Sequence, residues 1–478
     1  VGIMAAGHRR YWEQFPGSRD ATINGGKRFR HLVEQNPVDV VMPELVDHTE
    51  AAFAAGRALG EAGIDLLFVY LHTYVASGFW VPGILQLNVP IVLVCLPRSF
   101  DMEQEYVTGT AIMQGSPCQL PEACSALVRV GRPAADLVLG DPDIQPGVIG
   151  EIDGWCRVAS ALRAYKDCTI GYLGHTYDGM LDMNFDPTAI TGTFGIYCKM
   201  LEMCELVKHV EETTDKQVQT KIEEMKDIFL FPGASGDPLT RQATPEQIAW
   251  SARCALGLNT LVEQHNLGGL AYYYEGENGS IQEQVAAGLI VGNTLLTSSG
   301  ISLAGEADMK TCLAMKTTSA LGAGGSFAEF SVVDFERQEV YVGHDGPHDI
   351  RITDCRPKIR ALDLYHGKKG SGLAVEFGIR KGPITIVGLA LDASAHFKFV
   401  VAEGESMPGR LPEIANGVTR GWFGPDVAAF LKAWSMSGVS HHMSLCVGHI
   451  AGVVEKLGRA MGLEVEVVCR APGSAGEV

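Results

Sequence analysis

The sequence lacks any apolar run long enough to cross a lipid bilayer. Its longest apolar runs, Leu66–Leu71 and Ile91–Leu96, fall far short of the ~20 residues that a transmembrane helix needs. The first ten residues, VGIMAAGHRR, also lack a charged leader followed by an extended apolar stretch, which is the pattern of a secretory signal. We therefore expect a cytoplasmic protein that is neither exported nor inserted in a membrane.

Cysteine pairs with metal-binding spacing are absent as well. The 12 cysteines are scattered from Cys95 to Cys469, and none forms a CxxC pair. A chain of 478 residues can bury enough apolar surface to fold without disulfide bonds, so free thiols in a reducing compartment are expected. The missing thiolate pairs argue against a structural zinc site.

Positive charge is scarce. The 56 acidic residues outnumber the 38 basic ones, and the formal net charge is −18. A protein of this charge does not attract nucleic acid or anionic lipid in general, so neither is expected as a partner. An anionic ligand would need a local basic pocket.

Three common active-site motifs are missing too. No GxGxxG follows the first apolar run, and neither GxxxxGK[ST] nor GxSxG occurs, so we expect no nucleotide cofactor and no serine nucleophile of the hydrolase kind. Gly322–Gly325 is rich in glycine but follows a helical segment rather than a strand. This placement indicates a helix stop rather than a phosphate-binding loop.

What the chain does contain is the pattern of a large α/β protein. Its length predicts about three domains, which we place at residues 1–166, 167–318 and 319–478. The first two are expected to be α/β domains with doubly wound, Rossmann-like parallel sheets. The third is expected to be an antiparallel, barrel-like β domain.

In the first domain, short apolar runs alternate with helical segments, which is typical of βαβ units. Ala51–Ala62 has the composition and spacing of a crossover helix. The expected strands are Val1–Ala6, Val38–Met42, Ile64–Leu71 and Ile91–Leu96.

A second α/β block begins near Asp167, and one of its helices is well signalled. Thr244 is a capping residue, Pro245 suits the first helical position and Gln247 completes a capping box, after which the apolar spacing is helical. The expected strands of this block are Thr169–Leu173, Ile228–Phe231 and Leu270–Tyr274.

After about Ser319 the apolar runs alternate with polar residues or are β-branched, and Gly and Pro separate them. This pattern predicts antiparallel strands. The runs are Ser326–Phe335, Glu339–Val342, Leu373–Phe377, Ile384–Leu391 and Phe397–Val401.

Polar clusters follow three of the expected strands, at the edge where open α/β sheets bind their ligands. A single histidine at such a place is often only a hydrogen-bonding group, but three clusters together predict a polar cleft. The candidate substrate-binding residues in them are His8, Arg9, Tyr11, His72, Tyr74, His175 and Tyr177.

Two carboxylates and an imidazole lie in consecutive elements further along. Glu306 follows an apolar run, Glu329 interrupts an apolar strand, and His344 closes the next hairpin. A charge inside an apolar strand is costly unless it is paired, protonated or bound to a metal. Glu329 therefore indicates a metal site or a proton-transfer site.

A histidine pair, His441-His442, stands in another apolar context, Trp434–Val447. Adjacent side chains on a strand point to opposite faces, so only one of the two is expected to reach a given site. The alternative is one satisfied core histidine and one surface histidine. Carboxylate and imidazole donors suit Mn²⁺, Mg²⁺, Co²⁺ or Zn²⁺.

These residues resemble motifs of the L-arabinose isomerase family and, more loosely, of the L-fucose isomerases that share its fold. The order and spacing of the motifs agree along nearly the whole chain. The matching segments are Gly305–Thr311 (family GEGDWKT), Ser326–Glu329 (SFMED), Gly343-His344 (GSH), Ser440–His442 (AHH) and His72–Tyr74 (HTF).

The resemblance implies a sugar substrate, a homo-oligomer of the hexamer type, and a divalent cation, usually manganese, between the second and third domains. Carried over residue by residue, Glu306 and Glu329 would be metal ligands and acid/base groups. His344 and His442 would be the remaining ligands, and His441 would bind substrate.

Two segments depart from the family pattern. Ala6–Trp12 reads AGHRRYW where the family has GSQHLYG, and no counterpart of the family's AHGGRE is found around Gly115–Cys118. Both segments contact sugar in the family, so the identity of the aldose stays open. Arg9 and Arg10 predict an anionic or strongly hydrogen-bonding group at the sugar end remote from C1. The structural alternative is that the two arginines only form salt bridges to a neighbouring subunit.

The expected reaction moves one hydrogen between C1 and C2 of an aldose and a proton between O1 and O2. An enediol route, in which one glutamate removes the C2 proton, and a metal-assisted hydride shift both fit the residues. The sequence does not assign the two glutamate roles. Two other classes of function stay open: a metal-dependent sugar lyase or aldolase, and a non-catalytic sugar-binding protein.

Overall fold

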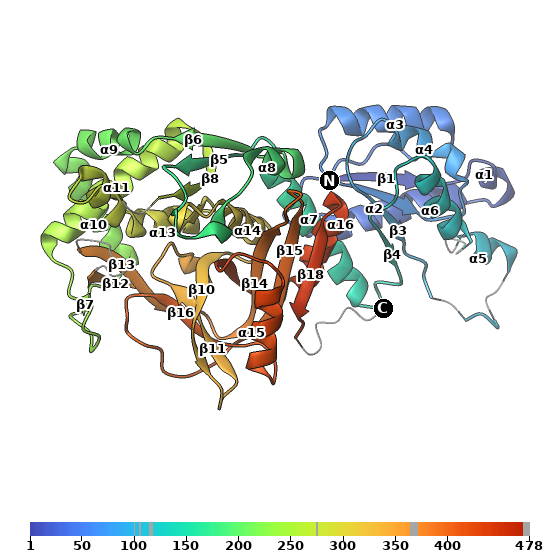
Figure 1. Cartoon of the computed structure of the whole chain (residues 1–478). Helices are drawn as coiled ribbons and strands as arrows, with labels where there is room; N and C mark the ends of the chain where they lie inside the picture. Colours follow the sequence, from blue (N-terminus) through green and yellow to red (C-terminus); the bar gives the residue numbers. More distant parts are fainter. Residues whose placement is uncertain (100, 105–106, 114–117, 274–275, 364–370, 472–478) are drawn as a thin grey trace. The chain divides into compact units, whose positions relative to one another are not determined.

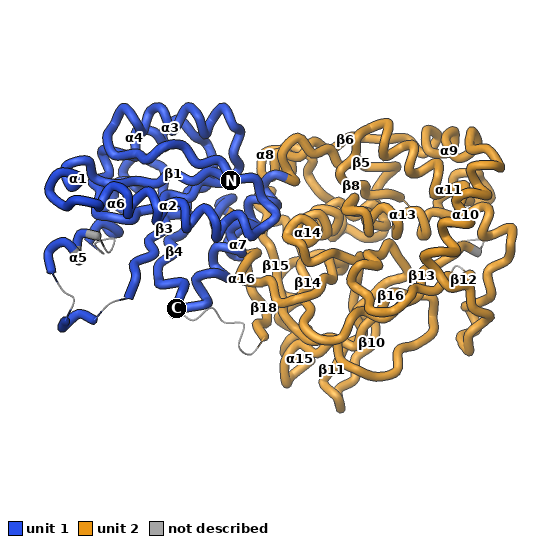
Figure 2. Tube along the Cα trace, turned by 180° about the vertical axis from the view of Figure 1, so that it is seen from behind, with its two compact units in different colours: residues 1–163, 455–462 blue, residues 164–454, 463–478 orange. Residues whose placement is uncertain are grey.

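A computed structural model describes residues 1–99, 101–104, 107–113, 118–273, 276–363 and 371–471. The chain forms two compact units, residues 1–163 with 455–462 and residues 164–454 with 463–478 (Figure 2). Within the described ranges, no helix is both long and apolar enough to cross a membrane. The division into three domains stays a prediction.

The first unit is built on a parallel sheet of four strands that pair in sequence order (Figure 1). Val41 and Val46 add isolated parallel bridges to Gly2 and Ala6, so their segment extends the sheet beyond its first strand. The resulting order is that of doubly wound sheets, in which the ligand crevice lies beyond the carboxyl ends of the strands next to the switch point. The strands are β1 (Gly2–Ala6), β2 (Leu67–Leu71), β3 (Ile91–Cys95) and β4 (Asp136–Leu139).

The prediction of a strand at Val38–Met42 is wrong, because only Val41 of this run forms a β-bridge. Pro37 and Pro43 flank this run. Proline has no N–H to donate to a strand ladder, so the run cannot pair along its length.

Helices cover both faces of this sheet, with α3 and α4 on one face and α2 on the other (Figure 1). The helix predicted at Ala51–Ala62 is confirmed as α3. A Cβ on Gly56 would lie 2.3 Å from the main-chain oxygen of Gly83, so the close approach of α3 and α4 requires glycine there. The helices are α1 (Tyr11–Gln14), α2 (Ser18–Val33), α3 (Thr49–Glu61), η1 (Ser77–Phe79), α4 (Val81–Ile84), α5 (Thr108–Met113), α6 (Gln119–Arg129) and α7 (Gly147–Tyr165).

The second unit contains a further parallel sheet, in the order β6-β5-β8-β9. Its switch point lies between β5 and β8, so the segments after these two strands face the crevice of this sheet. The strands are β5 (Thr169–Leu173), β6 (Tyr197–Leu201), β8 (Leu267–Tyr272) and β9 (Ser302–Ala304).

The strand expected at Ile228–Phe231 is wrong for this sheet. Ile228 ends helix α10, and Leu230 bridges Lys358 of another sheet. A short apolar run does not by itself distinguish a helix end from a buried strand. The strand expected at Leu270–Tyr274 begins earlier, at Leu267, and Tyr274 lies outside the described residues.

The capped helix of this block is confirmed as α11. The Thr244 hydroxyl accepts a hydrogen bond from the Gln247 main-chain N–H at 3.3 Å, and the Gln247 side chain accepts one from the Thr244 N–H at 3.0 Å. The helices of the second unit are η2 (Leu181–Met183), α8 (Pro187–Phe194), α9 (Met203–Glu212), α10 (Asp215–Ile228), α11 (Pro245–Gln264), α12 (Ile281–Ala287), α13 (Ile290–Ser298), η3 (Gly305–Ala307), α14 (Met309–Ala320), η4 (Ile350–Ile352) and α15 (Val427–Met436). Helix α16 (Ala451–Met461) spans both units.

The other strands of the second unit form one sheet of ten, six of which close into a β-barrel. Six strands close on themselves in the order β15-β14-β17-β10-β11-β16, and every neighbouring pair is antiparallel. The predicted fold class, parallel α/β sheets followed by an antiparallel barrel, is therefore confirmed. The strands are β7 (Thr240–Arg241), β10 (Ser326–Asp334), β11 (Glu339–His344), β12 (Lys358–Asp363), β13 (Ser371–Gly378), β14 (Gly382–Leu391), β15 (Phe397–Ser406), β16 (Gly417–Trp422), β17 (Met443–Val447) and β18 (Glu464–Cys469).

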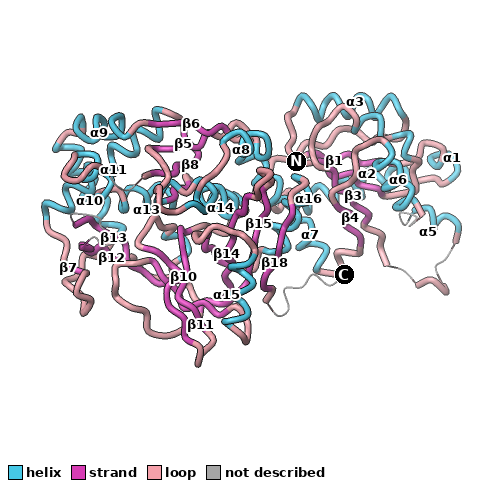
Figure 3. The backbone as a smooth tube through the Cα atoms, in the orientation of Figure 1, coloured by secondary structure: helices cyan, strands magenta, loops and turns pink. Residues whose placement is uncertain are grey.

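Helix α14 lies between the parallel sheet and the barrel (Figure 3). It packs against β8 and β9 on one side and against β14 and β17 on the other, so it is buried nearly all round. Gly322 and Gly324, with φ of 77° and 74°, follow its end, which confirms the predicted helix stop. This arrangement brings the end of β9 close to the barrel strands.

Candidate active site

Glu306 stands directly after β9, in the short turn η3. Its backbone has φ 58° and ψ 16°, and the next residue, Ala307, also has positive φ. Such a conformation costs a residue other than glycine about 1–3 kcal/mol and persists only where the surrounding structure enforces it. The Glu306 side chain is thereby held in a buried position, with the residue 8% exposed.

The barrel contributes three residues from neighbouring elements. Glu329 lies in β10 opposite Gly343 of β11, and His344 ends β11. His442 directly precedes β17, which pairs with the start of β10. The four residues predicted as ligands therefore converge from β9, β10, β11 and the segment before β17.

Ligand atoms of these residues form two overlapping groups. Glu329, His344 and His442 offer one set and Glu306, His441 and His442 the other, with the atoms of each set within 4.8 Å of one another. Glu306 Oε1 lies 4.0 Å from His344 Nε2, and Glu306 Oε2 lies 3.8 Å from His442 Nε2. These separations are too long for hydrogen bonds but suit donors arranged around a shared ion.

Two of these atoms bear on whether the donor set could hold a cation. Glu306 Oε2 and His442 Nε2 are both buried and neither has a hydrogen-bond partner among the described residues. A buried acceptor left unpaired loses its hydration without compensation. A divalent cation between them would satisfy both atoms, so the donor set fits a bound metal.

Asp308 fixes the orientation of His442. Its Oδ2 lies 3.1 Å from His442 Nδ1, and neither side chain is exposed. Burial raises the pKa of Asp308, but the bonds from His442 and Thr311 outweigh this and hold it below its usual value. Burial lowers the pKa of His442. The neutral imidazole then donates through Nδ1 and keeps the Nε2 lone pair for a metal.

His344 is held in a similar way. Its Nδ1 lies 2.9 Å from Asp345 Oδ1 and 3.0 Å from the Gly346 carbonyl oxygen, which leaves Nε2 facing Glu306. Burial lowers the pKa of His344, but Asp345, Glu329 and Glu306 together raise it to about 9. The carboxylates thus create a strongly negative potential that attracts a cation.

The expectation that only one of the paired histidines reaches the site is wrong. His441 and His442 lie in a bend before β17 rather than on the strand, so the alternation of strand side chains does not apply. Their ring centroids are 3.9 Å apart, and both rings are within reach of Glu306.

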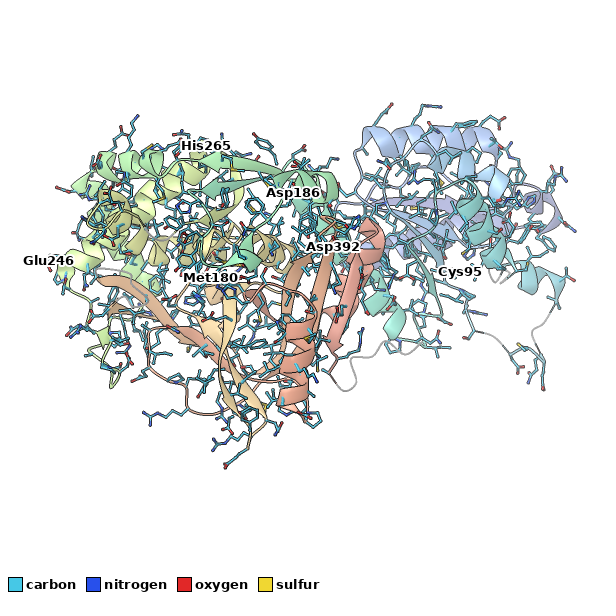
Figure 4. All side chains as sticks on the ribbon, viewed as in Figure 1. Cys95, Met180, Asp186, Glu246, His265 and Asp392 are labelled. Atoms are coloured by element: carbon cyan, nitrogen blue, oxygen red, sulfur yellow. The ribbon has the colours of Figure 1, made fainter. Side chains whose placement is uncertain are left out.

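Sequence reasoning missed several carboxylates around these histidines. Asp308 had a signal, because an aspartate three residues before Thr311 is a typical helix cap, and it does accept from the Thr311 N–H at 3.0 Å. Asp182 had none. It lies in η2, after β5, where the preceding Met180 is labelled in Figure 4, and its pairing with His441 arises only from the fold.

The polar cluster after β1 forms a small aromatic group in the first unit. The His8 ring lies 4.7 Å from Tyr11, 5.2 Å from Phe79 and 6.5 Å from Tyr74, between ring centroids. Burial, together with the charge of Arg10, lowers the pKa of His8. The structure thus brings His8, Tyr11 and Tyr74 together, and their role in binding substrate stays a prediction.

Arg9 forms a salt bridge. It donates to Asp47 Oδ1 at 3.2 Å and lies 2.6 Å from His48 Nδ1. Asp47 also accepts from Trp12 Nε1 at 2.7 Å. Arg9 is therefore paired with a carboxylate of the same unit.

The residues of the other two clusters make contacts of their own. His72 pairs with the Tyr70 hydroxyl at 3.1 Å in the first unit, and burial lowers its pKa. His175 is exposed after β5, and its ring lies tilted against that of Tyr273, with the centroids 4.0 Å apart. Among the described residues, His175 belongs to neither of the two ligand groups.

Comparison with known families agrees with this geometry. A family model described as L-arabinose isomerase central domain matches residues 185–324, and one described as L-arabinose isomerase C-terminal domain matches residues 324–464. Together they span more than half of the 478 residues. The chain belongs to the L-arabinose isomerase family. It is an isomerase of the aldose–ketose class.

Within this family the chain is a divergent member. It is 24% identical to an L-arabinose isomerase of Nocardioides sp. over 462 residues, which cover 90% of this chain and 86% of the relative. An L-arabinose isomerase of Serratia proteamaculans is 25% identical, with 85% and 81% covered, and one of Geobacillus thermodenitrificans is 21% identical, with 84% and 80% covered. The family matches contain Glu306 in the central segment and Glu329, His344 and His442 in the C-terminal segment.

Proposed function

We propose that this isomerase is metal-dependent and that Glu306, Glu329, His344 and His442 hold one divalent cation. The observation that carries the proposal is the pair of buried, unpartnered atoms, Glu306 Oε2 and His442 Nε2, which are 3.8 Å apart. Oxygen and imidazole nitrogen donors without a thiolate suit Mn²⁺ as the native ion, with Mg²⁺, Co²⁺ and Zn²⁺ as alternatives.

The chain's own residues then divide the work of the reaction. Glu306 and Glu329 are the two proton-transfer groups, one for the hydrogen at C2 and one for the hydroxyl protons. Asp308 and Asp345 orient the two histidines through Nδ1. The bound cation supplies stabilisation of the negative charge that develops on the sugar oxygens.

We further propose that the aldose carries an anionic or strongly hydrogen-bonding group remote from C1. Arg9 is already paired with Asp47, so Arg10 is the residue that supports this. Its side chain is exposed and has no ion-pair partner in the described part of the chain. A guanidinium of this kind can donate two hydrogen bonds at once to a carboxylate, phosphate or sulfonate.

The activity and the substrate are tested together by a panel of aldoses followed by NMR. Neutral pentoses and hexoses are compared with their C6-acidic and C6-sulfonated counterparts, using Mn²⁺-loaded protein. Formation of the 2-ketose supports the isomerase, whereas cleavage products would indicate a lyase and binding without turnover a sugar-binding protein. Preference for neutral sugars, with Arg10→Ala and Arg9→Ala unchanged in KM, would remove the anionic substrate.

We also propose that the chain acts as a homo-oligomer, a hexamer by analogy with the family. Two large apolar side chains at the β10–β11 hairpin support self-association, since Val332 is 59% and Phe335 63% exposed. Light scattering on the purified protein tests this, because a monomer would have a mass of 51.3 kDa. A monomer at micromolar concentration would contradict the proposal.

A further inference from the structure

Asp182 ties the segment after β5 to the barrel residues that precede β17. One carboxylate oxygen, Oδ2, accepts from the His441 main-chain N–H at 3.0 Å and lies 2.7 Å from His441 Nδ1. The main-chain oxygen of Asp182 accepts from the Lys310 ammonium and, at 3.4 Å, from the Ser440 hydroxyl. A single residue thus makes four contacts with two elements of the candidate active site.

The carboxylate contact determines which face His441 presents. A carboxylate accepts and cannot donate, so the proton of a neutral His441 sits on Nδ1 and the lone pair on Nε2. The second bond, to the main-chain N–H of the same residue, fixes the direction of the ring. The ring also contacts that of His442, with the centroids 3.9 Å apart and the planes tilted by 42°. His441 therefore has one preferred orientation beside the metal ligands.

The burial of this pair differs from that of the Asp308–His442 pair. Asp308 and His442 side chains are fully buried, whereas the Asp182 and His441 side chains are 42% and 36% exposed. A buried imidazole beside two carboxylates is placed to hold an ion. A half-exposed imidazole within reach of the same Glu306 is placed to meet a molecule that arrives from solvent.

We propose that Asp182 is a positioning residue for the isomerase reaction. It orients His441 so that Nε2 accepts a hydrogen bond from a sugar hydroxyl at the mouth of the metal site. This inference rests on the proposed function, since it assumes that a sugar binds beside Glu306. Asp182 itself does not touch the substrate, and its effect passes through His441.

The main-chain contacts make Asp182 suitable for substitution. Lys310, which is 5% exposed, and Ser440 both bind the main-chain oxygen, and this oxygen remains in any variant. Removal of the carboxylate therefore frees the His441 ring without releasing the segment. Asp178, which is exposed and lies in the same segment, provides a matched control.

The test is a double-mutant cycle with Mn²⁺-loaded protein on the aldose that the substrate panel identifies. We expect Asp182→Ala to lower kcat/KM about tenfold, mainly by raising KM, because the lost hydrogen bond is made in both the bound and the transition state. His441→Ala should lower kcat/KM at least as much. In the His441→Ala background, adding Asp182→Ala should lower kcat/KM by less than a further factor of about two. Asp182→Asn should stay within about threefold of wild type, since its amide oxygen can accept both bonds, and Asp178→Ala should be neutral.

If Asp182→Ala lowered kcat/KM by the same factor in wild type and in the His441→Ala variant, the proposal would be overturned, because Asp182 would then act independently of the His441 ring. Loss of Mn²⁺ affinity in the Asp182→Ala variant would also overturn it, since a general structural role or a role in metal binding would follow. Calorimetric Mn²⁺ titration without sugar should give the same affinity as wild type within about twofold.

A second measurement separates this inference from the proposed function. Imidazole ¹⁵N shifts of His441, assigned with the His441→Ala variant, should show Nδ1 protonated in wild type and a tautomer mixture in Asp182→Ala. If no aldose is isomerised but the shifts change as expected, the proposed function fails and the orienting contact stands. If the shifts are the same in both proteins, the positioning role fails whatever the activity.

Discussion

Glu306 holds a backbone conformation that its own side chain disfavours. Its φ of 58° lies in the left-handed region, and the following Ala307 repeats this at 56°. Two successive residues of this kind cost free energy that an ordinary turn with glycine would avoid. Retaining a glutamate there makes sense if the turn aims the carboxylate at the ligands of the barrel.

The first prediction concerns the two glutamates. Glu306→Gln and Glu329→Gln should each lower kcat by far more than tenfold while the protein stays folded, because each change removes a ligand charge and a proton acceptor. A loss below about tenfold corresponds to under about 1.4 kcal/mol of transition-state stabilisation and would show that the residue is not catalytic. Initial rates and circular dichroism are the measurements. Glu246→Gln, at an exposed position of α11 (Figure 4), is the isosteric control.

The second prediction concerns Asp308. Both Asp308 oxygens accept hydrogen bonds: Oδ1 from the Thr311 N–H, and Oδ2 from the Thr311 hydroxyl while it faces His442 Nδ1. In Asp308→Asn the amide NH₂ must replace one of these oxygens. If the remaining oxygen keeps the Thr311 N–H, the NH₂ faces His442 Nδ1 and two donors meet. The imidazole is expected to move its proton to Nε2, where it blocks the metal. Mn²⁺ affinity should fall about 10- to 100-fold by calorimetry, the range found when such supporting carboxylates are lost.

The control for this change is Asp186→Asn. Asp186 also caps a helix, accepting from the Thr188 N–H at 2.7 Å, and asparagine caps as well as aspartate. Its Mn²⁺ affinity should match wild type. Unaltered affinity in Asp308→Asn would mean that Asp308 only caps α14.

How far single residues could be foreseen depends on whether their signal is local. Glu329 was conspicuous, because a charge in an apolar run has few explanations. Asp182 was not conspicuous, because a polar residue in a polar segment has many explanations. Its partner His441 lies 259 positions away. Long-range pairing of this kind leaves no trace in residue spacing.

At the scale of elements, the stability of α11 should depend on its cap. Thr244→Ala removes the hydroxyl that accepts from the Gln247 N–H and should destabilise the protein by about 1 kcal/mol. The cap lies on an exposed residue, so kcat should not change. Denaturant unfolding followed by far-UV circular dichroism measures the effect.

Thr260→Ala is the matched control in the same helix. Thr260 is exposed and its hydroxyl donates back to the Leu256 carbonyl oxygen at 3.0 Å. Alanine has the higher helix propensity, so this variant should be as stable as wild type or slightly more so. Equal destabilisation by both changes would contradict a specific role for the cap.

The elements that could be predicted are those whose sequence pattern and packing agree. β10, β11, β14 and α11 fell close to their expected bounds, because alternation and capping signals coincide there. β6 (Tyr197–Leu201) was not expected, since it has a lysine and exposed side chains as an edge strand of its sheet. The run at Ile228–Phe231 was assigned to the wrong sheet because apolar content says nothing about the partner strand.

At the scale of the whole molecule, the candidate site exists only when the second unit is folded. Glu306 comes from the end of the parallel sheet, while Glu329, His344 and His442 come from the barrel. Helix α14 packs against both layers and connects Glu306 to the barrel through Asp308, its capping residue. Any separation of the two layers would take the ligands apart.

The last prediction follows from this dependence. Chelation should abolish activity and Mn²⁺ should restore it, and the same ion should stabilise the fold because it binds the folded chain and not the unfolded one. At a free Mn²⁺ concentration of about 100 times Kd the stabilisation is about 2.7 kcal/mol, which calorimetry detects as a higher unfolding temperature. His442→Ala should lose most of this increase, whereas His396→Ala, at an exposed histidine, should keep it. Full activity of metal-free protein, or an unfolding temperature that Mn²⁺ leaves unchanged, would remove the metal site from the mechanism.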